Sequence, residues 1–364
     1  MNPEHQENKA KEPGWASGPR LIAWEVTRTC NLSCVHCRAA SLDKPYPNEF
    51  TTEECLRLLD EVAAFASPIM ILTGGEPLLR PDIFEIAAYG SNKGIRMVLA
   101  TNGILIDAET GSRMRESGIQ RVSISLDGAT ALSHDRFRQV DGAFAGSLRG
   151  IDFLKAASID FQINTTITRD NLHELPDIQK LAVDLGAVAH HIFLLVPTGR
   201  GKDFKEQEIA SEDYERTLHW FYDQSQKVEL QLKATCAPHY YRILRQRAKE
   251  EGQEITVKTH GMDAVTRGCL GGTAFLFISH VGQVQPCGYL EVDSGNVREL
   301  PLREIWRDSE VLKQLRDFGA YKGKCGICEY RKVCGGCRAR AFEASGDYME
   351  EEPLCTHVPR AACT

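Results

Sequence analysis

The sequence lacks the features that would place it at a membrane. No apolar run reaches the ~20 residues that cross a bilayer, and the polar residues 1–19 contain neither the apolar core nor the cleavage site of a signal peptide. Positive charge is also scarce, because 43 Lys and Arg stand against 50 Asp and Glu. Nucleic-acid binding in general needs a basic surface. These absences predict a cytoplasmic protein with no membrane span and no nucleic-acid partner.

Cysteine, in contrast, is abundant. The chain has 13 cysteines, and an odd number of thiols in a reducing compartment does not suit disulfides, so metal or cluster ligation is the better explanation. Cys30, Cys34 and Cys37 directly follow an apolar run at residues 21–26 that predicts a buried strand. Three thiolates on one loop can hold three irons of a four-iron cluster and leave the fourth iron open. The alternative is a structural zinc site completed by His36, since such sites usually have four protein ligands.

Short apolar runs alternate with longer segments of helical period from Leu21 onward. This alternation predicts parallel strands joined by crossover helices. The predicted strands are residues 21–26, 69–73, 95–100, 120–125, 159–167 and 188–196. Six such units form a partial α/β barrel whose strand ends line one mouth. The predicted division of the chain is a disordered lead-in (1–18), the barrel (19–226) and a bridging, cysteine-rich region (227–364).

The cysteine loop and the end of the second strand together resemble a known superfamily. Cys-x3-Cys-x2-Cys after a first strand, followed by Gly-Gly-Glu at residues 74–76, is similar to the signature of radical S-adenosylmethionine (SAM) enzymes. The resemblance implies a partial (βα)6 TIM-like barrel and a [4Fe-4S] cluster on the three cysteines. SAM would chelate the open iron, and a low-potential donor such as ferredoxin or flavodoxin would supply the electron that splits SAM into methionine and a 5'-deoxyadenosyl radical. An anaerobic cell is implied as well.

The same resemblance assigns SAM contacts at the strand ends. They are Gly74, Gly75, Glu76, Asn102, Ser125, Asp127 and Thr166. Ser125 and Asp127 have an alternative role, which is to cap turns. Arg136 and Arg138 could pair with a carboxylate of SAM or substrate, or lie exposed on a helix flank. No residue is identified as a catalytic acid or base.

A second cysteine pattern occupies the C-terminal part of the chain. It reads Cys269-x12-Gly282-x4-Cys287, then Cys325-x2-Cys328-x5-Cys334-x2-Cys337 and Cys355. Two β-rich runs, 274–279 and 284–286, predict a hairpin that turns at Gly282. The pattern resembles the SPASM domain, which carries auxiliary [4Fe-4S] clusters in radical SAM enzymes, although that domain usually has x3 before the position of Cys337.

The resemblance divides these cysteines into two sets. One auxiliary cluster would use Cys325, Cys328, Cys334 and Cys355. A second would use Cys269, Cys287 and Cys337, with Cys236 as the candidate fourth ligand, or the chain has a single auxiliary cluster. Zinc remains the alternative for a double Cys-x2-Cys pattern. Cys55 and Cys363 are expected to have no metal role.

Three further segments resemble the tetrapyrrole-modifying branch of the superfamily. They are residues 195–201, 236–240 and 285–289. Their resemblance is strongest to SAM-dependent haem synthases, and it implies oxidative decarboxylation of two propionates of Fe-coproporphyrin III to vinyls, giving protohaem. Arg200 and Lys202 then become candidates to hold propionates, or they are solvated cations of a loop. His190 and His191 are candidate axial ligands of the porphyrin iron, with a core or surface role as the alternative.

Other functions share this pattern. A sister enzyme would use the same cofactors: a didecarboxysirohaem deacetylase, a haem d1 pathway enzyme or a peptide maturase. A protein of another class would bind iron–sulfur clusters or zinc without catalysis. Iron and sulfide content, with SAM cleavage on reduction, would separate the second possibility from the first.

Overall fold

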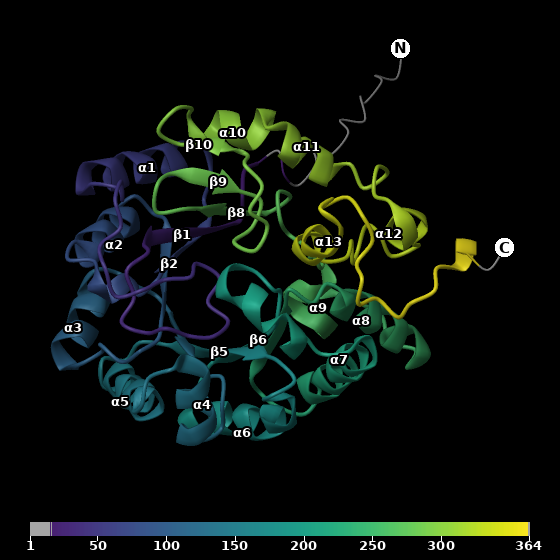
Figure 1. Cartoon of the computed structure of the whole chain (residues 1–364), viewed down its shortest axis with the longest axis horizontal. Coiled ribbons are helices and arrows are strands. Elements are labelled where there is room, and N and C mark those ends of the chain that lie inside the picture. Colours follow the sequence, from purple (N-terminus) through teal and green to yellow (C-terminus); the bar gives the residue numbers. More distant parts are fainter. Residues whose placement is uncertain (1–14, 16, 363–364) are drawn as a thin grey trace, which may run out of the picture.

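A computed structural model places Trp15 and residues 17–362 of the chain (Figure 1). Most of the predicted lead-in, and Cys363, lie outside the described residues. Trp15 itself is packed against the protein, because its carbonyl oxygen accepts the indole N–H of Trp306 at 2.8 Å. None of the helices in the described part of the chain is both long and apolar enough to cross a membrane.

Ten strands form one sheet in the order β10-β9-β8-β1-β2-β3-β4-β5-β6-β7. The predicted strands are confirmed as β1 (Leu21–Thr27), β2 (Ile69–Gly74), β3 (Arg96–Thr101), β4 (Val122–Ser125), β5 (Phe161–Ile167) and β6 (Ala189–Leu194). Each of them pairs in parallel with the next. Their carboxyl ends therefore meet at one edge, where sites of such barrels are built.

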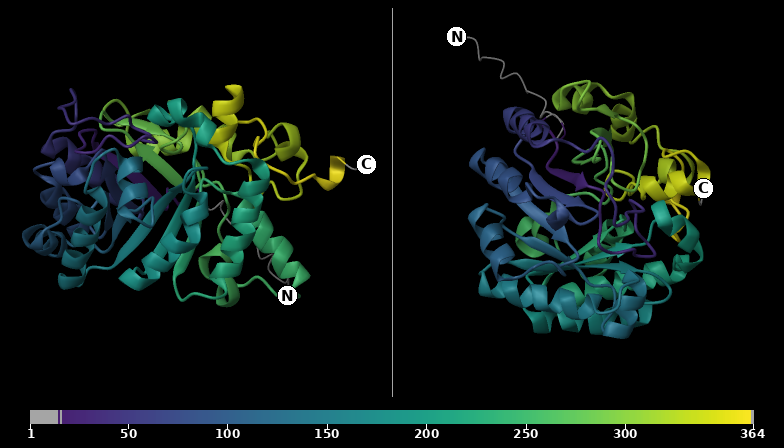
Figure 2. Two further views of the ribbon diagram at one scale, coloured as in Figure 1. Left: turned by 60° about the horizontal axis from the view of Figure 1, so that its bottom comes forward. Right: turned by 60° about the vertical axis from the view of Figure 1, so that its left-hand side comes forward.

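Helices cover the outer face of the curved sheet (Figures 1 and 2). They are α1 (Thr52–Phe65), α2 (Ile83–Asn92), α3 (Ala108–Glu116), α4 (Ala131–Arg138), α5 (Ala143–Ala156), α6 (Leu175–Leu185), α7 (Ser211–Ser225) and α8 (His239–Glu250). Side chains alternate along each strand. Ile22, Trp24 and Val26 of β1 belong to the buried core beneath the helices, so the residues between them, including Glu25, face the barrel interior.

Local sequence decides where these helices begin and end. The α1 helix starts behind a capping box, in which the side chains of Thr51 and Glu54 each accept the other residue's backbone N–H. The α6 helix ends at Gly186, whose φ of 82° lies in the left-handed region that only glycine adopts without strain. Such signals allow the helix boundaries of the barrel to be predicted from the sequence.

The sheet continues past the six predicted strands. β7 (Gln231–Thr235) pairs in parallel with β6, and β8 (Phe275–Ile278) pairs in parallel with β1 at the opposite side. β8 turns back into β9 (Gln283–Gln285), which pairs with β10 (Gly295–Asn296), so the predicted hairpin is present and extends the barrel sheet. The sequence pattern misses β7 because only Leu232 and Ala234 are apolar in it. The sheet thus crosses the predicted boundary between residues 226 and 227, and that division stays a prediction.

Short helices and turns complete the described chain. The helices are α9 (Val257–His260), α10 (Leu302–Asp308), α11 (Glu310–Arg316), α12 (Gly323–Ile327) and α13 (Arg338–Ser345). The 3₁₀ turns are Pro77–Leu79, Leu172–Glu174, Gly199–Gln207, Gly261–Ala264 and Arg360–Ala362. In the left view of Figure 2, the purple loop after β1 and the yellow C-terminal segment both lie along the upper edge of the molecule. Both cysteine-bearing regions therefore share the barrel mouth.

Candidate cofactor site and metal centres

The loop after β1 carries the N-terminal triad, Cys30, Cys34 and Cys37. Cys30 and Cys34 are each 7% exposed, and the Leu32 N–H donates to the Cys30 sulfur at 3.4 Å. Burial raises the pKa of Cys30 to about 12, and the charges of the other two thiolates raise it as well. A bound metal reverses this effect, because it deprotonates its thiol ligands outright. The loop is therefore suited to hold a cluster and unsuited to hold free thiolates.

The spacing of the ligand atoms favours a cluster over a single zinc ion. Among the residues that the structure describes, only Cys328, Glu329 and His357 bring three Cys, His or acidic ligand atoms within 4.8 Å of one another. A tetrahedral zinc ion with Zn–S bonds of about 2.3 Å draws its sulfurs closer together than that. The N-terminal triad is more widely spaced, which leaves room for a larger centre. His36 packs its ring on Phe137, with the ring centroids 4.5 Å apart.

The glycines after β2 let the chain pass against the entry to the cysteine loop. The Gly75 N–H donates to the Thr27 carbonyl at 2.8 Å, and the Glu76 N–H donates to the Thr29 carbonyl at 2.8 Å. A Cβ atom on Gly75 would overlap the Thr29 carbonyl oxygen, and one on Gly74 would overlap that of Thr27. Close approach of SAM was the predicted reason for these glycines. The structure adds a second reason, which is contact between two strand ends.

The Glu76 carboxylate is fully buried and links the turn after β2 to the end of β3. It accepts the Thr101 hydroxyl at 2.7 Å, the Asn102 N–H at 2.9 Å and the Leu78 N–H at 3.0 Å. Burial raises the pKa of Glu76 to about 7, and the hydrogen bonds only partly oppose it. The Asn102 side chain in turn donates to the Asn31 side chain of the cysteine loop at 2.8 Å. A cationic amino group of a ligand placed here would stabilise the charged carboxylate.

Asp127 has partners within the chain that were not predicted, and its contact with SAM stays a prediction. Its carboxylate forms an ion pair with Arg138 and accepts the Thr166 N–H at 2.7 Å. Burial raises the pKa of Asp127, while the charge of Arg138 opposes the rise. Arg138 also donates to the sulfur of Cys34 at 3.5 Å, so it is an internal link and not the exposed flank residue. Asp127 therefore acts on the cysteine loop through Arg138, whereas the 78% exposed side chain of Arg136 faces solvent.

Ser125 and Thr166 keep the placement that was predicted for them. Both are half-buried at the carboxyl ends of β4 and β5. Their contact with SAM stays a prediction.

Arg200 is a correction to the prediction. Its Nε donates to the Cys34 carbonyl at 2.9 Å and its Nη1 to the Ser41 carbonyl at 2.7 Å. Its backbone N–H donates to the Cys37 carbonyl at 3.0 Å. Two of the three guanidinium nitrogens thus bind the cysteine loop, and the third, Nη2, is buried without a partner in the described part of the chain, so no two-donor fork is free for a propionate. Lys202 remains exposed at the mouth, 3.4 Å from Glu343 of α13.

The two histidines of β6 point in opposite directions. His190 is fully buried on the helix side, where its ring lies 6.5 Å from that of Phe221 and its Nε2 lies 3.0 Å from the Thr165 hydroxyl. That position corresponds to the core role, which was the alternative to axial ligation. His191 faces the interior, and its Nδ1 is 3.0 Å from the Gln162 amide nitrogen. Burial lowers the pKa of His190 to about 4 and that of His191 to about 3.

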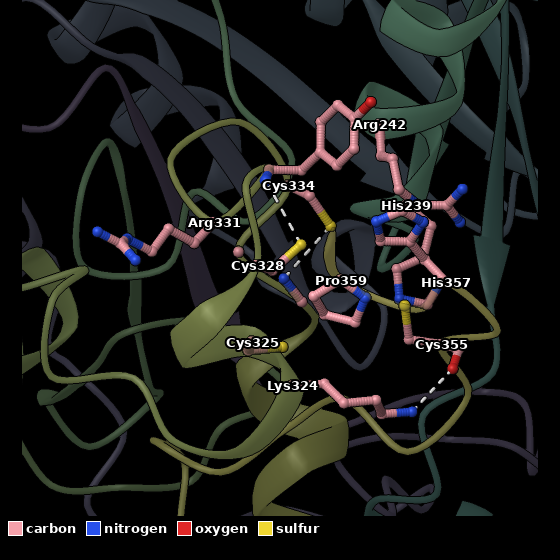
Figure 3. Close-up of a pocket in the computed structure, with 13 residues that line it drawn as sticks. His239, Arg242, Lys324, Cys325, Cys328, Arg331, Cys334, Cys355, His357 and Pro359 are labelled. Atoms are coloured by element: carbon pink, nitrogen blue, oxygen red, sulfur yellow. Dashed lines mark hydrogen bonds between the residues drawn. The ribbon is translucent and has the colours of Figure 1, made fainter. Parts of the chain in front are cut away.

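Four cysteines line a single pocket in the C-terminal region (Figure 3). This C-terminal set consists of Cys325, Cys328, Cys334 and Cys355. Backbone N–H groups of Glu352, Tyr330 and Gly336 donate to the first three sulfurs, each at 3.4 Å. A Cβ atom on Gly336 would stand 3.0 Å from the Cys325 sulfur. Thiolates surrounded by N–H donors and by a glycine that leaves them room are a suitable donor set for a [4Fe-4S] cluster.

The other four cysteines also come together. This dispersed set consists of Cys236, Cys269, Cys287 and Cys337, and it includes the residue that was predicted as the fourth ligand. Burial raises the pKa of the Cys236 thiol, and the charges of its three partners raise it further. The same holds among the others, since the charge of Cys269 raises the pKa of both Cys287 and Cys337. Cys236 has a φ of 56°, a strained left-handed conformation that directs it into this group.

Cys55 lies apart from these groups. It is fully buried in α1, and its sulfur accepts an N–H of Arg80 at 3.3 Å. This position agrees with the packing role predicted for it.

The sequence analysis missed a buried carboxylate inside the barrel. Glu25 of β1 accepts Arg28 at 2.7 Å and Arg38 at 2.8 Å, and His280 lies 3.2 Å away. Burial favours its neutral form, but Arg38, His280 and Arg28 together lower the pKa of Glu25. Arg38, the residue after Cys37, also lies over the Phe277 ring at 4.3 Å. The sequence signal that could have indicated this carboxylate was the single charged residue within the apolar run 21–26.

A second missed feature joins the barrel to the C-terminal region. Arg340 is almost fully buried and forms ion pairs with Glu208 at 2.9 Å and Glu352 at 3.2 Å. It donates to the carbonyls of Leu195 at 3.0 Å and Cys236 at 3.3 Å. One side chain thereby connects the end of β6 with the dispersed set. Nothing in the local sequence distinguishes this arginine from an exposed one.

Comparison with known proteins identifies two domains. Residues 24–182 match the radical SAM superfamily, and residues 269–338 match SPASM, an iron–sulfur cluster-binding domain. The cofactors of these domains are SAM and [4Fe-4S] clusters. Cys236 and Cys355 lie outside both matched ranges.

Full-length relatives and a solved structure agree with these matches. A protein of Nitratidesulfovibrio vulgaris named AdoMet-dependent heme synthase is 60% identical over 94% of this chain and 93% of its own length. The Fe-coproporphyrin III synthase of Methanosarcina barkeri is 32% identical over 97% of this chain and 90% of its own. SuiB of Streptococcus suis, solved with S-adenosylmethionine, has the same fold, with a TM-score of 0.72 and 16% identity over 94% of this chain and 78% of SuiB. The chain is therefore a radical SAM enzyme with a SPASM domain and belongs to the family of the AdoMet-dependent heme synthases.

Proposed function

We propose that this enzyme converts Fe-coproporphyrin III into protohaem by oxidative decarboxylation of two propionates to vinyls. The observation that carries the proposal is the 60% identity, over nearly the whole of both chains, to a protein named AdoMet-dependent heme synthase. Identity to the Fe-coproporphyrin III synthase is only 32%, which makes the sister reaction the second choice. A non-catalytic role does not suit a chain with a SAM domain and three cysteine groups.

The chemistry requires one radical and one electron acceptor for each propionate. SAM and its cluster supply a 5'-deoxyadenosyl radical when they are bound. The propionate loses one hydrogen atom to form 5'-deoxyadenosine, and then loses carbon dioxide and one electron as the vinyl double bond forms. The electron needs an acceptor within the protein, and the C-terminal and dispersed sets are suited to hold clusters that take it.

The residues of this chain have distinct roles in that scheme. The N-terminal triad holds the SAM cluster, and residues 74–76 with Asn102 bind the amino end of SAM. Ser125 and Thr166 contact the cofactor from neighbouring strand ends, and Arg138 and Arg200 fix the cysteine loop in place. Lys202 at the mouth attracts the anionic substrate. A low-potential donor such as ferredoxin or flavodoxin supplies electrons, and the reaction takes place in the cytoplasm.

The proposal is tested by turnover under anaerobic conditions. Reconstituted protein is incubated with SAM, a reductant and Fe-coproporphyrin III, and the products are identified by mass spectrometry. We expect protohaem and two molecules of 5'-deoxyadenosine for each haem. Unchanged Fe-coproporphyrin III, together with turnover of didecarboxysirohaem in a parallel incubation, would move the function to the sister reaction.

A further inference from the structure

The start of α8 connects the two auxiliary cysteine sets. Cys236 belongs to the dispersed set, and His239 and Arg242, three and six residues later, line the pocket of the C-terminal set. Figure 3 shows the His239 ring on the side of the pocket formed by α8, with Cys334 and Cys355 nearby, and Arg242 beside it. Residues three apart on a helix share one face. One short segment therefore reaches both sets.

His239 is a buried polar side chain without a hydrogen-bond partner. It is 0% exposed, and neither ring nitrogen has a hydrogen bond within the described chain. Its ring packs against Tyr214, with centroids 4.8 Å apart, which fixes the direction of the nitrogens. At least one ring nitrogen carries a proton in every tautomer. A buried N–H aimed into a pocket of four thiols indicates an acceptor that belongs in that pocket.

Arg242 repeats this arrangement one turn further along. Its two terminal nitrogens are occupied, one by Glu215 at 2.6 Å and the other by Gln246 at 2.7 Å. Its Nε is buried and has no hydrogen-bond partner in the described part of the chain. The guanidinium is therefore held in place while its Nε edge remains available. Two unpaired N–H groups on one helix face line the same pocket.

We propose that His239 donates a hydrogen bond to a sulfur atom of the cluster held by the C-terminal set and thereby raises the reduction potential of that cluster. Reduction adds negative charge to a cluster, and N–H donors at its sulfurs stabilise the reduced form. Within the proposed function, on which this consequence rests, the His239 donor makes the C-terminal cluster a better acceptor of the electron that each propionate releases.

The test is a potentiometric titration followed by electron paramagnetic resonance (EPR) on the full chain, without SAM or porphyrin. The couple of the C-terminal set is identified as the one lost in Cys355→Ala. The His239→Phe variant keeps a ring against Tyr214 but has no N–H. In this variant we expect the reduced-to-oxidised ratio of the C-terminal cluster at a fixed potential to fall about ten-fold, which is a shift of about 59 mV for a one-electron couple. His239→Gln retains a donor and should stay near wild type. His190→Phe removes another buried imidazole and should leave the couple unchanged.

A second measurement starts from the wild-type protein. Protein labelled with ¹⁵N-histidine should show a hyperfine coupling between a histidine nitrogen and the reduced C-terminal cluster. The coupling should persist in His357→Phe, the other histidine that lines the pocket. The proposal would be overturned if labelled and unlabelled wild-type protein gave the same spectrum. It would also be overturned if a cluster-loaded His239→Phe protein had an unchanged reduction potential. Because neither experiment uses substrate, its outcome is independent of whether Fe-coproporphyrin III is the substrate.

Discussion

The C-terminal and dispersed sets differ in how the chain assembles them. The C-terminal set comes from one stretch, residues 325–355, and its cysteines line one pocket formed by neighbouring loops. The dispersed set collects residues from 236 to 337 across a strand end, a hairpin and a helix start. The first can be formed locally, whereas the second requires the barrel and the C-terminal region to be in place together. Loss of the dispersed cluster should therefore indicate a disturbed contact between the barrel and the C-terminal region. Loss of the C-terminal cluster should indicate a local disturbance.

Replacing the N-terminal triad should have the largest effect on activity, and it should not change the difference between the C-terminal and dispersed sets. The variant with Cys30, Cys34 and Cys37 all changed to Ala should form no 5'-deoxyadenosine, measured by liquid chromatography. It should still hold about eight irons, since each remaining cluster contributes four. Continued formation of 5'-deoxyadenosine would show that the SAM cluster lies elsewhere.

Cys236→Ala addresses the contrast directly. It removes the one ligand of the dispersed set that lies before the matched SPASM domain, and iron content should fall by about four per chain. Cys55→Ala is the matched control, because Cys55 is buried in α1 away from both sets. Equal iron in the two variants would mean that Cys236 is not a ligand.

Arg340→Met should weaken the contact between the barrel and the C-terminal region, on which the dispersed set depends. It leaves the buried carboxylate of Glu352 without its partner, and breaking a buried pair in this way costs about 3–5 kcal/mol of the free energy of unfolding. Urea unfolding of the anaerobic protein measures the change. Arg307→Met serves as the control, since its pair with Asp308 is exposed and its loss should not shift the transition. A stable Arg340→Met protein that loses only the C-terminal cluster would reverse the comparison.

The pH dependence of SAM binding should be moderate and should come from Glu76. Because burial raises the pKa of this carboxylate to about 7, most of it is protonated at pH 6 and ionised at pH 8. SAM presents an amino group to it, so affinity should fall as the pH drops, by about ten-fold between pH 8 and pH 6. Glu76→Gln should bind SAM with much less pH dependence. An identical pH profile in the variant would assign the effect to another group.

The smallest effect should follow substitution of Lys202. Its exposed side chain is partly neutralised by Glu343, so Lys202→Ala should weaken Fe-coproporphyrin III binding by only about two- to five-fold. Arg200→Ala should instead lower the iron content of the N-terminal triad, because Arg200 holds the carbonyls of its loop. Normal iron with strongly weakened porphyrin binding in Arg200→Ala would restore the original interpretation of that residue.

Features that depend on neighbouring residues were predictable from the sequence. The strands from β1 to β6 and the cysteine loop follow from apolar runs and close cysteine spacing. The C-terminal set, which passes over Cys337 for Cys355, was implied by the resemblance to the SPASM domain. Cys236 could be suggested only because a fourth ligand was needed. β7 was missed because its apolar residues are few.

Roles that depend on contacts between distant segments were not predictable. Arg138 and Arg200 resembled ligand-binding cations, but the fold directs them to the cysteine loop. Glu25 and Arg340 act only through partners brought close by the sheet and the C-terminal region. Gly75 suggested close approach of a ligand, while the structure adds a contact with the Thr29 carbonyl. A Gly75→Val protein is thus expected to disturb the cysteine loop as well as SAM binding.

The most direct test of the whole account is the content of iron and acid-labile sulfide in the full chain, purified and reconstituted anaerobically. Three clusters predict about twelve irons and twelve sulfides per chain. Mössbauer spectra should show all of this iron in [4Fe-4S] form. About eight irons would leave the dispersed set without a cluster, and stoichiometric zinc in place of iron would contradict the assignment of both auxiliary sets.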